Sequence, residues 1–177
     1  MDKKYPRLGR RTVKLSEGVE QAIHSVAMLA QLSEEGVLSA GELAEYHGVK
    51  TSYLLKHLQA LSGAGILATL PGPKGGYRLA RTAAKITLLD IVLAVEGPQP
   101  AFRCLEIRQR GPNPLPVKPT RPCEINAAML RAEKAYRAEL QRVTIADILK
   151  DVAAGDDGSI AARGCAFLAI HERRQGA

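Results

Sequence analysis

Two cysteines, Cys104 and Cys123, frame a proline-rich stretch that reads AFRCLEIRQRGPNPLPVKPTRPC. Prolines so closely spaced do not fit a helix or a central strand, so the stretch is expected to form an extended surface loop. Long loops of this kind are commonly functional. Two thiolates can bind a metal ion or an iron-sulfur cluster, form a reversible disulfide, or act as nucleophiles. The sequence alone leaves open what these two thiols hold.

A second candidate pair, Glu20 and His24, lies four residues apart in a segment with helical periodicity. This spacing places both side chains on one face of a helix, where they can converge on a single metal ion. An ordinary Glu-His pair on the polar side of a helix has the same spacing. The two interpretations cannot be separated by spacing.

The remaining cysteine and histidines are weaker candidates for a functional site. Three cysteines are too few for the disulfide framework of a secreted domain, and an odd number leaves one unpaired within the chain. Cys165 is interpreted as an unreactive thiol, and His47 and His57 as structural or solvent-facing residues. Glu106 and Arg108 flank Cys104 and are candidates for the groups that surround a bound metal.

The sequence predicts no membrane-spanning helix. No apolar run approaches the roughly 20 residues of a membrane span, and the N-terminus has no apolar stretch that could act as a signal peptide. We therefore expect a cytoplasmic protein that does not contact a membrane.

The net charge is +7, and the first 14 residues carry six basic side chains against Asp2. A basic arm of this kind commonly contacts nucleic acid, although a solvated tail has the same composition. The basic residues of the arm are Lys3, Lys4, Arg7, Arg10, Arg11 and Lys14.

The elements that must position these residues begin with a helix from Ser16, as N-cap, to about Leu32. A short second helix is expected in SAGELAEYHG, where Ser39 and Glu42 form a capping-box pattern and Gly48 ends the helix. A third helix follows in VKTSYLLKHLQALSGAG, with Thr51 or Ser52 as its cap. Two short helices joined around a glycine are typical of a helix-turn-helix.

The third helix would be the recognition helix of this unit. Its outward side chains can reach phosphates and base edges, whereas a purely structural hairpin has no need for a polar set at this end. These side chains are Ser52, Tyr53, Lys56 and Gln59. The segments ILATL and YRLAR around PGPKGG then predict a β-hairpin, which in this position would be a wing. Lys74, Arg78 and Arg81 on the hairpin are expected to contact the DNA backbone or a groove.

The second half of the chain is expected to carry the dimer contact. A helix over residues 86–96, capped at Thr87 and ended by Gly97, precedes the proline-rich loop. From about Glu124 an alanine-rich helix of roughly 20 residues has an apolar stripe that a symmetric dimer would bury. The stripe comprises Ile125, Ala128, Met129, Ala132, Ala135, Tyr136 and Leu140. The stretch from Ala153 onward is expected to be partly without regular structure.

The expected fold is therefore mainly α with a small β-hairpin wing, a winged helix-turn-helix domain plus a long dimerisation helix. The predicted division of the chain has five parts. They are a basic arm (1–14), a DNA-binding domain (15–97), a cluster-binding loop (98–122), a dimerisation helix region (123–150) and a C-terminal tail (151–177).

Four segments together resemble the winged-helix regulators of the IscR and NsrR type, also called the Rrf-two family. The segments are KLSEGVEQAIHSVAMLA, SYLLKHLQALSGAGIL, PGPKGGYRLAR and ITLLDIVLAVEG, and the resemblance covers roughly residues 13–145. It implies a homodimeric transcription factor that binds a palindromic operator in double-stranded DNA. Many members of this family sense conditions through an iron-sulfur cluster.

The usual cluster-binding pattern of that family has three closely spaced cysteines, whereas this loop has two. AFRCLEIRQRGP followed by a cysteine at the start of the long helix closely resembles the redox-sensing RsrR subgroup. That resemblance implies a [2Fe-2S] cluster at the dimer interface, with Cys104 and Cys123 from one subunit and Glu20 and His24 from the other. Histidine in place of a cysteine raises the reduction potential of such a cluster, which suits an electron-transfer switch.

Three alternatives remain at this stage. The first is a DNA-binding regulator in which Cys104 and Cys123 form a reversible disulfide or bind zinc with Glu20 and His24. The second is an enzyme with one of these cysteines as nucleophile, although no known catalytic signature surrounds either thiol. The third is a protein-protein adaptor that uses only the long helix, which would leave the wing and the basic arm without a role.

Overall fold

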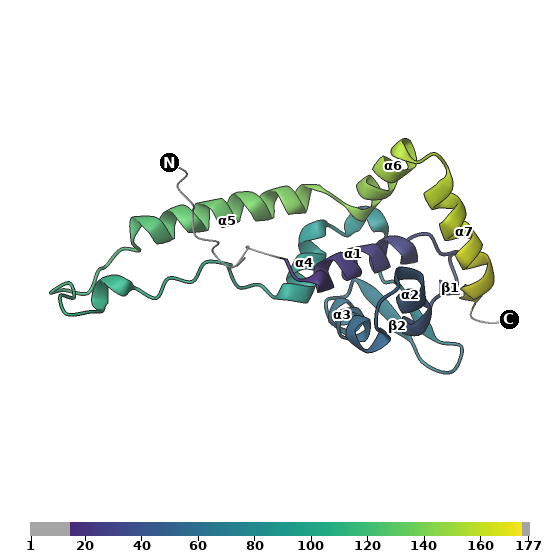
Figure 1. Ribbon diagram of the computed structural model, residues 1–177, viewed down its shortest axis with the longest axis horizontal. Coiled ribbons are helices and arrows are strands. Elements are labelled where there is room, and N and C mark those ends of the chain that lie inside the picture. The colour runs from purple at the N-terminus through teal and green to yellow at the C-terminus, as the bar shows by residue number, and fades with distance from the viewer. Residues whose placement is uncertain (1–14, 175–177) are drawn as a thin grey trace, which may run out of the picture.

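Residues 15–174 are described by the structure, a computed structural model, and they form seven α-helices and four short strands (Figure 1). The expected fold class, mainly α with a small β-hairpin, is confirmed. The basic arm of residues 1–14 lies outside the described residues. In chain order the elements are α1 (Glu17–Leu29), β1 (Gly36–Val37), α2 (Ala40–His47), α3 (Thr51–Gly63), β2 (Leu67–Leu70), β3 (Gly76–Leu79), η1 (Ala83–Lys85), α4 (Leu88–Glu96), η2 (Ile107–Gln109), α5 (Glu124–Arg142), α6 (Ile145–Gly155), α7 (Ser159–His171) and β4 (Arg173–Arg174).

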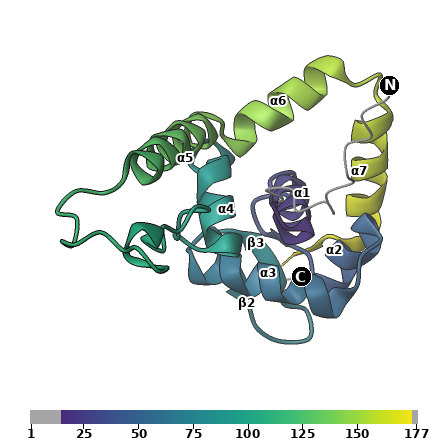
Figure 2. The same ribbon diagram turned by 60° about the vertical axis from the view of Figure 1, so that its left-hand side comes forward.

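Helix α1 is central, with α4, α6, α7 and the α2–α3 pair arranged around it (Figure 2). It buries Ala22, Val26 and Leu29 in the common core, where α3 and α4 pack against it. Gly18 lies where α1 meets α3, and a Cβ atom at this position would overlap the His57 ring. The close approach of α1 to α3 therefore depends on the absence of a side chain at residue 18.

Helix α1 ends at Leu29, three residues before the expected boundary near Leu32. The backbone N–H groups of Gln31 and Leu32 donate to the carbonyls of Met28 and Leu29 at 3.1 and 3.4 Å. This i to i−3 pattern closes the helix with a tighter turn. Ser16 is the N-cap residue as expected, but its side chain makes no capping hydrogen bond.

The helix-turn-helix follows the predicted local signals closely. Ser39 Oγ accepts from the Glu42 N–H at 3.2 Å, and the Ser39 N–H donates to Glu42 Oε2 at 2.6 Å, which completes the capping box of α2. Gly48 then ends α2 with a left-handed φ of 66°. The expectation that Thr51 or Ser52 caps α3 is wrong. The hydrogen-bond ladder already starts from the Lys50 carbonyl, so Lys50 is the N-cap and both residues lie in the first turn.

The predicted hairpin is present as an antiparallel pair, with Leu67 opposite Leu79 and Leu70 opposite Gly76. Strand β3 is also joined to the segment after β1, because Leu38 and Tyr77 exchange two backbone hydrogen bonds of 3.2 and 2.8 Å. The hairpin therefore directly follows α3 and is held to the segment that precedes α2, as expected of a wing.

Helices α4 and α5 also begin where the sequence indicates. Thr87 and Asp90 form a capping box at the start of α4, and Gly97 ends the helix. Helix α5 begins at Glu124, buries none of its residues, and its N-terminal half extends beyond the winged domain together with the loop (Figure 1). Although α5 is the longest helix within residues 15–174, neither it nor any other there combines the length and apolar character of a membrane span.

The structure corrects the expectation for the stretch from Ala153 onward, which forms regular elements. Helix α6 continues to Gly155, α7 spans Ser159–His171, and β4 pairs with β1 in antiparallel register. Leu168 of α7 is buried in the common core, and Phe167 packs against it. The partners of this segment lie 100 residues or more earlier in the chain, so no local pattern indicates them.

Candidate functional site

The outer face of α3 carries the four side chains expected to read DNA. Leu54, Leu58 and Leu61 point into the core, which turns Ser52, Tyr53, Lys56 and Gln59 outward, and all four are exposed. Tyr53 retains 41% of its accessible surface and packs edge-on against His57 with ring centroids 4.9 Å apart. The helix thus presents a polar and basic surface of the kind that enters a DNA groove.

The three basic residues of the hairpin lie in different surroundings. Lys74 is exposed in the turn between β2 and β3. Arg78 is half-buried and lies 3.5 Å from a Glu35 carboxylate oxygen, while Arg81 lies 3.6 Å from Asp90. Lys74 is therefore the most exposed of the three basic side chains of the hairpin.

Glu20 and His24 occupy the outer side of α1, and both side chains are exposed. The opposite side of the same helix carries Gly18, Ala22 and Ser25 toward the interior. Because the two candidate ligands are not needed for core packing, they are available to a group that approaches from outside the subunit. Among the described residues, no set of three or more ligating side chains that could hold a metal ion comes together within one chain.

A further histidine, His47, lies beside His24, with ring centroids 5.8 Å apart. It is the last residue of α2, and burial lowers its pKa to about 4, with the charges of His24 and Arg163 acting in the same direction. The sequence predicts His47 only as a structural or solvent-facing residue. Its contact with α1 arises from the packing of two helices, so neither spacing nor composition could reveal it.

The two loop cysteines are half-buried and free. Cys123 is the N-cap of α5, and its sulfur accepts a hydrogen bond from the Asn126 N–H at 3.3 Å. Cys165, by contrast, is exposed on α7, far along the chain from both.

The two limbs of the loop are tied together by Arg108. Its guanidinium binds both carboxylate oxygens of Glu106, at 2.5 and 2.9 Å, and donates to the Arg121 carbonyl at 3.3 Å. The hydrogen bond with Glu106 is the main cause that raises the pKa of Arg108, and the charge of Cys123 adds to it. The same bond lowers the pKa of Glu106. Arg108 therefore links the limb after Cys104 to the limb that ends at Cys123.

The backbone at Glu106 supports a specialised role for this turn. Its φ of 49° is the only left-handed value of a non-glycine residue among residues 15–174. Such a conformation costs of order 1–3 kcal/mol and persists where surrounding contacts impose it. In this turn the Glu106 carboxylate accepts the two hydrogen bonds from Arg108, and the Glu106 carbonyl accepts one from the Gln109 N–H at 3.0 Å.

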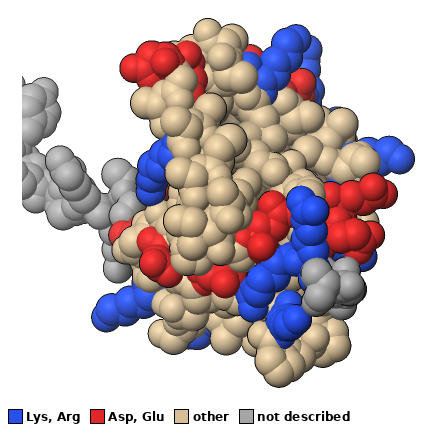
Figure 3. Space-filling view, turned by 90° about the vertical axis from the view of Figure 1, so that its right-hand side faces the viewer, with Lys and Arg blue, Asp and Glu red and all other residues tan. Residues whose placement is uncertain are grey.

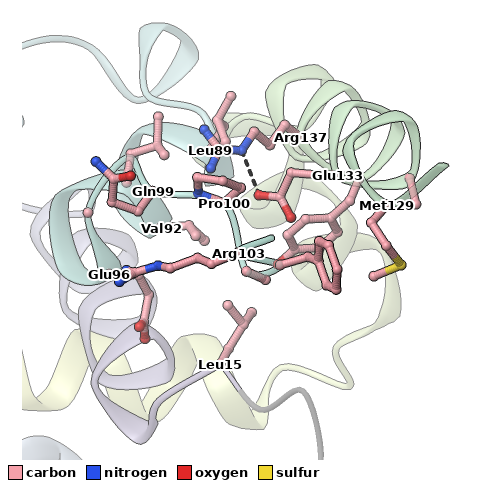
Figure 4. Close-up of a pocket in the computed structure, with 16 residues that line it drawn as sticks. Leu15, Leu89, Val92, Glu96, Gln99, Pro100, Arg103, Met129, Glu133 and Arg137 are labelled. Atoms are coloured by element: carbon pink, nitrogen blue, oxygen red, sulfur yellow. Dashed lines mark hydrogen bonds and ion pairs between the residues drawn. The ribbon is translucent and has the colours of Figure 1, made fainter. Parts of the chain in front are cut away.

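A cavity of about 770 Å³ lies between α4, the segment after it and α5 (Figure 4). Its walls are mainly apolar and include Val92, Phe102 and Met129. One rim is fixed by Arg137, which binds Glu133 at 2.8 Å and the Pro98 carbonyl at 2.9 Å. These bonds anchor the beginning of the proline-rich loop to the C-terminal half of α5.

Comparison with known proteins places the whole arrangement in one family. Residues 15–151 match the Rrf2 family, described as iron-dependent transcriptional regulators. The protein aau3 of Rhizobium meliloti (strain 1021) is 35% identical over 133 residues, which cover 74% of this chain and 83% of that protein. The similarity to this relative therefore extends over most of both chains.

Two solved structures have the same winged-helix fold. IscR of T. potens superimposes with a TM-score of 0.62 at 24% identity, covering 87% of this chain and 99% of that one. CymR (YrzC), the global cysteine regulator of B. subtilis, gives a TM-score of 0.60 at 23% identity, covering 77% and 96%. These identities establish a shared fold and not a shared ligand.

Because the family consists of transcriptional regulators, the alternative of a cysteine-nucleophile enzyme is excluded. The chain belongs to the Rrf2 family of winged-helix, DNA-binding transcriptional regulators.

Proposed function

We propose that this regulator is a homodimer that reads a palindromic operator and senses redox state through a [2Fe-2S] cluster, as in the RsrR subgroup. The observation that carries the proposal is the separation of two donor pairs. Glu20 and His24 lie on the outer side of α1, whereas Cys123 lies at the far end of α5, beyond the winged domain (Figures 1 and 2). One subunit thus supplies two half-sites, and a second subunit completes each of them.

Helix α5 supplies the surface for this second subunit. The apolar side chains of its stripe remain exposed in the single chain, Ile125 at 67% and Met129 and Tyr136 at 42%. A contiguous apolar stripe on a long helix marks an interaction site, and a symmetric dimer buries the same stripe on both chains. In this proposal residues 15–97 bind DNA, 98–122 form the cluster-binding loop and 123–150 form the dimerisation region. Such a regulator works in the cytoplasm, beside the DNA.

The donor set fits a [2Fe-2S] cluster of mixed ligation. Cys104 and Cys123 provide two thiolates, and the Cys123 sulfur lies at the start of α5. His24 and Glu20 provide one nitrogen and one oxygen from a single helix face. A cluster held in this way supplies a one-electron change, at a higher potential than an all-cysteine site.

The contacts of α1 explain how an event at this site reaches the DNA-reading helices. His24 touches His47 at the end of α2, and Gly18 lies against His57 of α3. A small rotation of α1 therefore acts on both helices of the helix-turn-helix. Because a palindromic operator requires a fixed spacing of its two half-sites, a change in the angle of the two reading heads lowers affinity.

The spectrum of anaerobically isolated protein tests the cluster. We expect a brown protein with about two iron atoms per subunit, and loss of the colour in Cys104→Ala or Cys123→Ala. Glu20→Ala and His24→Ala should change the visible and EPR spectra, since each removes a ligand from the other iron. Cys165→Ala and Glu45→Ala, both at exposed positions, serve as controls. Unaltered spectra in the two α1 variants would show that the mixed ligand set is wrong.

A thiol switch is the second candidate, because Cys104 and Cys123 are both free and half-buried and Arg108 ties their limbs together. In that case the protein is colourless, and oxidation converts two thiols into one disulfide in a way that a reductant reverses. Zinc bound by the same four residues would also give a colourless protein, but with zinc in metal analysis. Colour and metal content therefore separate the three forms of the proposal.

DNA binding through the outer face of α3 is tested by Lys56→Ala. Removing one phosphate-binding charge per subunit should weaken binding several-fold and reduce the slope of log affinity against log salt by about 0.9 for each phosphate that is no longer neutralised. Fluorescence anisotropy on a labelled duplex across a salt series measures both quantities. Lys150→Ala, an exposed lysine on α6, is the matched control and should leave the slope unchanged. Equal slopes for the two variants would remove Lys56 from the interface.

A further inference from the structure

The C-terminal segment lies beyond the part of the chain that matches the family, yet it packs against α2 and the wing turn. The family match ends at residue 151, and α7 and β4 follow it. Figure 1 shows α7 running down beside α2 toward β1. Figure 3 looks onto this end of the molecule, where basic and acidic side chains lie next to one another.

Helix α7 is anchored on the end of α2. Arg163 donates to the Tyr46 carbonyl at 2.8 Å, and its guanidinium lies 4.4 Å above the Tyr46 ring. Phe167, one helical turn later, packs on the same ring with centroids 4.9 Å apart, and Leu168 is buried beside it. A cation above an aromatic face and a buried aliphatic side chain fix the position of α7 on the helix-turn-helix.

The residues after α7 contact the segment that precedes α2. The carboxylate of Glu172 accepts hydrogen bonds from the backbone N–H of Ser33, at 3.0 Å, and from its hydroxyl. It lies where a Cβ atom of residue 36 would stand, so Gly36 makes room for it. Strand β4 then pairs antiparallel with β1, and Arg173 lies opposite Val37.

Arg173 connects the start of α2 with the wing turn, the segment between β2 and β3. Its guanidinium lies 2.7 Å from Glu42 Oε2, the oxygen that also accepts the Ser39 N–H in the capping box of α2. A second nitrogen donates to the Pro73 carbonyl in the wing turn at 3.3 Å. The side chains of Arg173 and Glu42 are only 29% and 20% exposed, so solvent screens this ion pair less than a surface pair. Pro73 immediately precedes Lys74, the exposed lysine of the wing.

We propose that Arg173 is a positioning residue for DNA binding, which holds the wing turn at a fixed place relative to the start of α2. It does not contact DNA itself. By fixing Pro73 it sets the distance between Lys74 and the outer face of α3, the two surfaces that must meet one duplex together. The proposal rests on DNA binding by the wing and the recognition helix.

The test combines Arg173→Gln with Lys74→Ala in a double-mutant cycle. The probe is a duplex of about 30 base pairs that the full-length wild-type protein enriches from a randomised pool, long enough for two half-sites. Arg173→Gln should weaken binding about fivefold in the wild-type background, the order of one or two phosphate contacts. In the Lys74→Ala background the same substitution should change affinity less than about twofold, because the side chain that it positions is gone. Arg174→Gln, the exposed neighbour, is the control.

Hydrogen exchange on the free protein gives a second readout that needs no DNA. The wing turn contains the Gly75 N–H, which donates to the Gly72 carbonyl at 2.9 Å. The backbone N–H groups of Gly72, Lys74, Gly75 and Gly76 should exchange faster in Arg173→Gln and at the wild-type rate in Arg174→Gln. The proposal is overturned if exchange in the wing turn is unchanged, or if Arg173→Gln weakens binding equally with and without Lys74. If the wild-type protein enriches no duplex, the proposed operator binding fails, while the exchange rates still report on the wing.

Discussion

A mixed dimer of two cluster-free variants should regain about half of the wild-type cluster content per dimer. One chain carries Cys104→Ala and Cys123→Ala, and the other carries Glu20→Ala and His24→Ala. If the ligands come from different subunits, the intact cysteines of the second chain meet the intact Glu20 and His24 of the first at one of the two interfacial sites. Each homodimer, by contrast, has two incomplete sites.

The experiment needs two affinity tags and co-expression, so that only mixed dimers are purified. Visible absorbance and iron content per dimer are then compared with those of the wild-type protein and of each homodimer. A mixed dimer that stays colourless, beside a brown wild-type protein, would indicate that all ligands come from one chain. A colourless wild-type protein would instead favour the thiol or zinc form of the proposal. The mixed dimer therefore tests the interface separately from the cluster.

Gly18→Val should destabilise the fold by about 3 kcal/mol or more, which is a large part of the stability of a small domain. Even the first carbon of a side chain at this position would overlap the His57 ring, so α1 and α3 must move apart. Moving the recognition helix also disturbs its outer face, and we expect DNA affinity to fall with stability. Urea unfolding followed by circular dichroism measures the first effect.

Gly63→Ala is the matched control, because Gly63 is also helical and has nothing within 4 Å of the added carbon. That variant should be neutral or more stable by up to about 1 kcal/mol, since alanine is the better helix former. An unfolding midpoint of Gly18→Val equal to that of the wild-type protein would contradict the close packing of α1 and α3. Gly36→Ala offers a milder comparison at the C-terminal segment, where the displaced group is the end of the Glu172 side chain.

Much of the fold could be predicted because its signals are local. The Ser39–Glu42 capping box, the left-handed Gly48 and the glycine-rich wing turn each involve residues within a few positions of one another. The start of α5 at Glu124 is of the same kind, since prolines end just before it and alanines follow. Where local signals competed, the prediction was wrong. Lys50, Thr51 and Ser52 are adjacent, and only the hydrogen-bond ladder shows which of them is the N-cap of α3.

The parts that escaped prediction depend on contacts between distant segments. Helix α7 has few buried residues, and it and the residues after it are held by Tyr46, Ser33 and Glu42, all in the first third of the chain. The contact of His24 with His47 depends likewise on how α1 meets α2. The candidate cluster site has a further obstacle, because its proposed halves belong to two chains. Spacing within one sequence can identify each half but cannot join them.

The two faces of α1 differ in which substitutions they can accept without disturbing the fold. Positions 18 and 22 are constrained by the fold, since they lie against the interior, whereas positions 20 and 24 are exposed. An exchange of side chain at position 20 leaves the core as it is, whereas an exchange at position 24 also alters the contact with His47 at the end of α2. A single helix therefore separates, by half a turn, positions whose side chain the packing fixes from an exposed position whose side chain can change without disturbing the core.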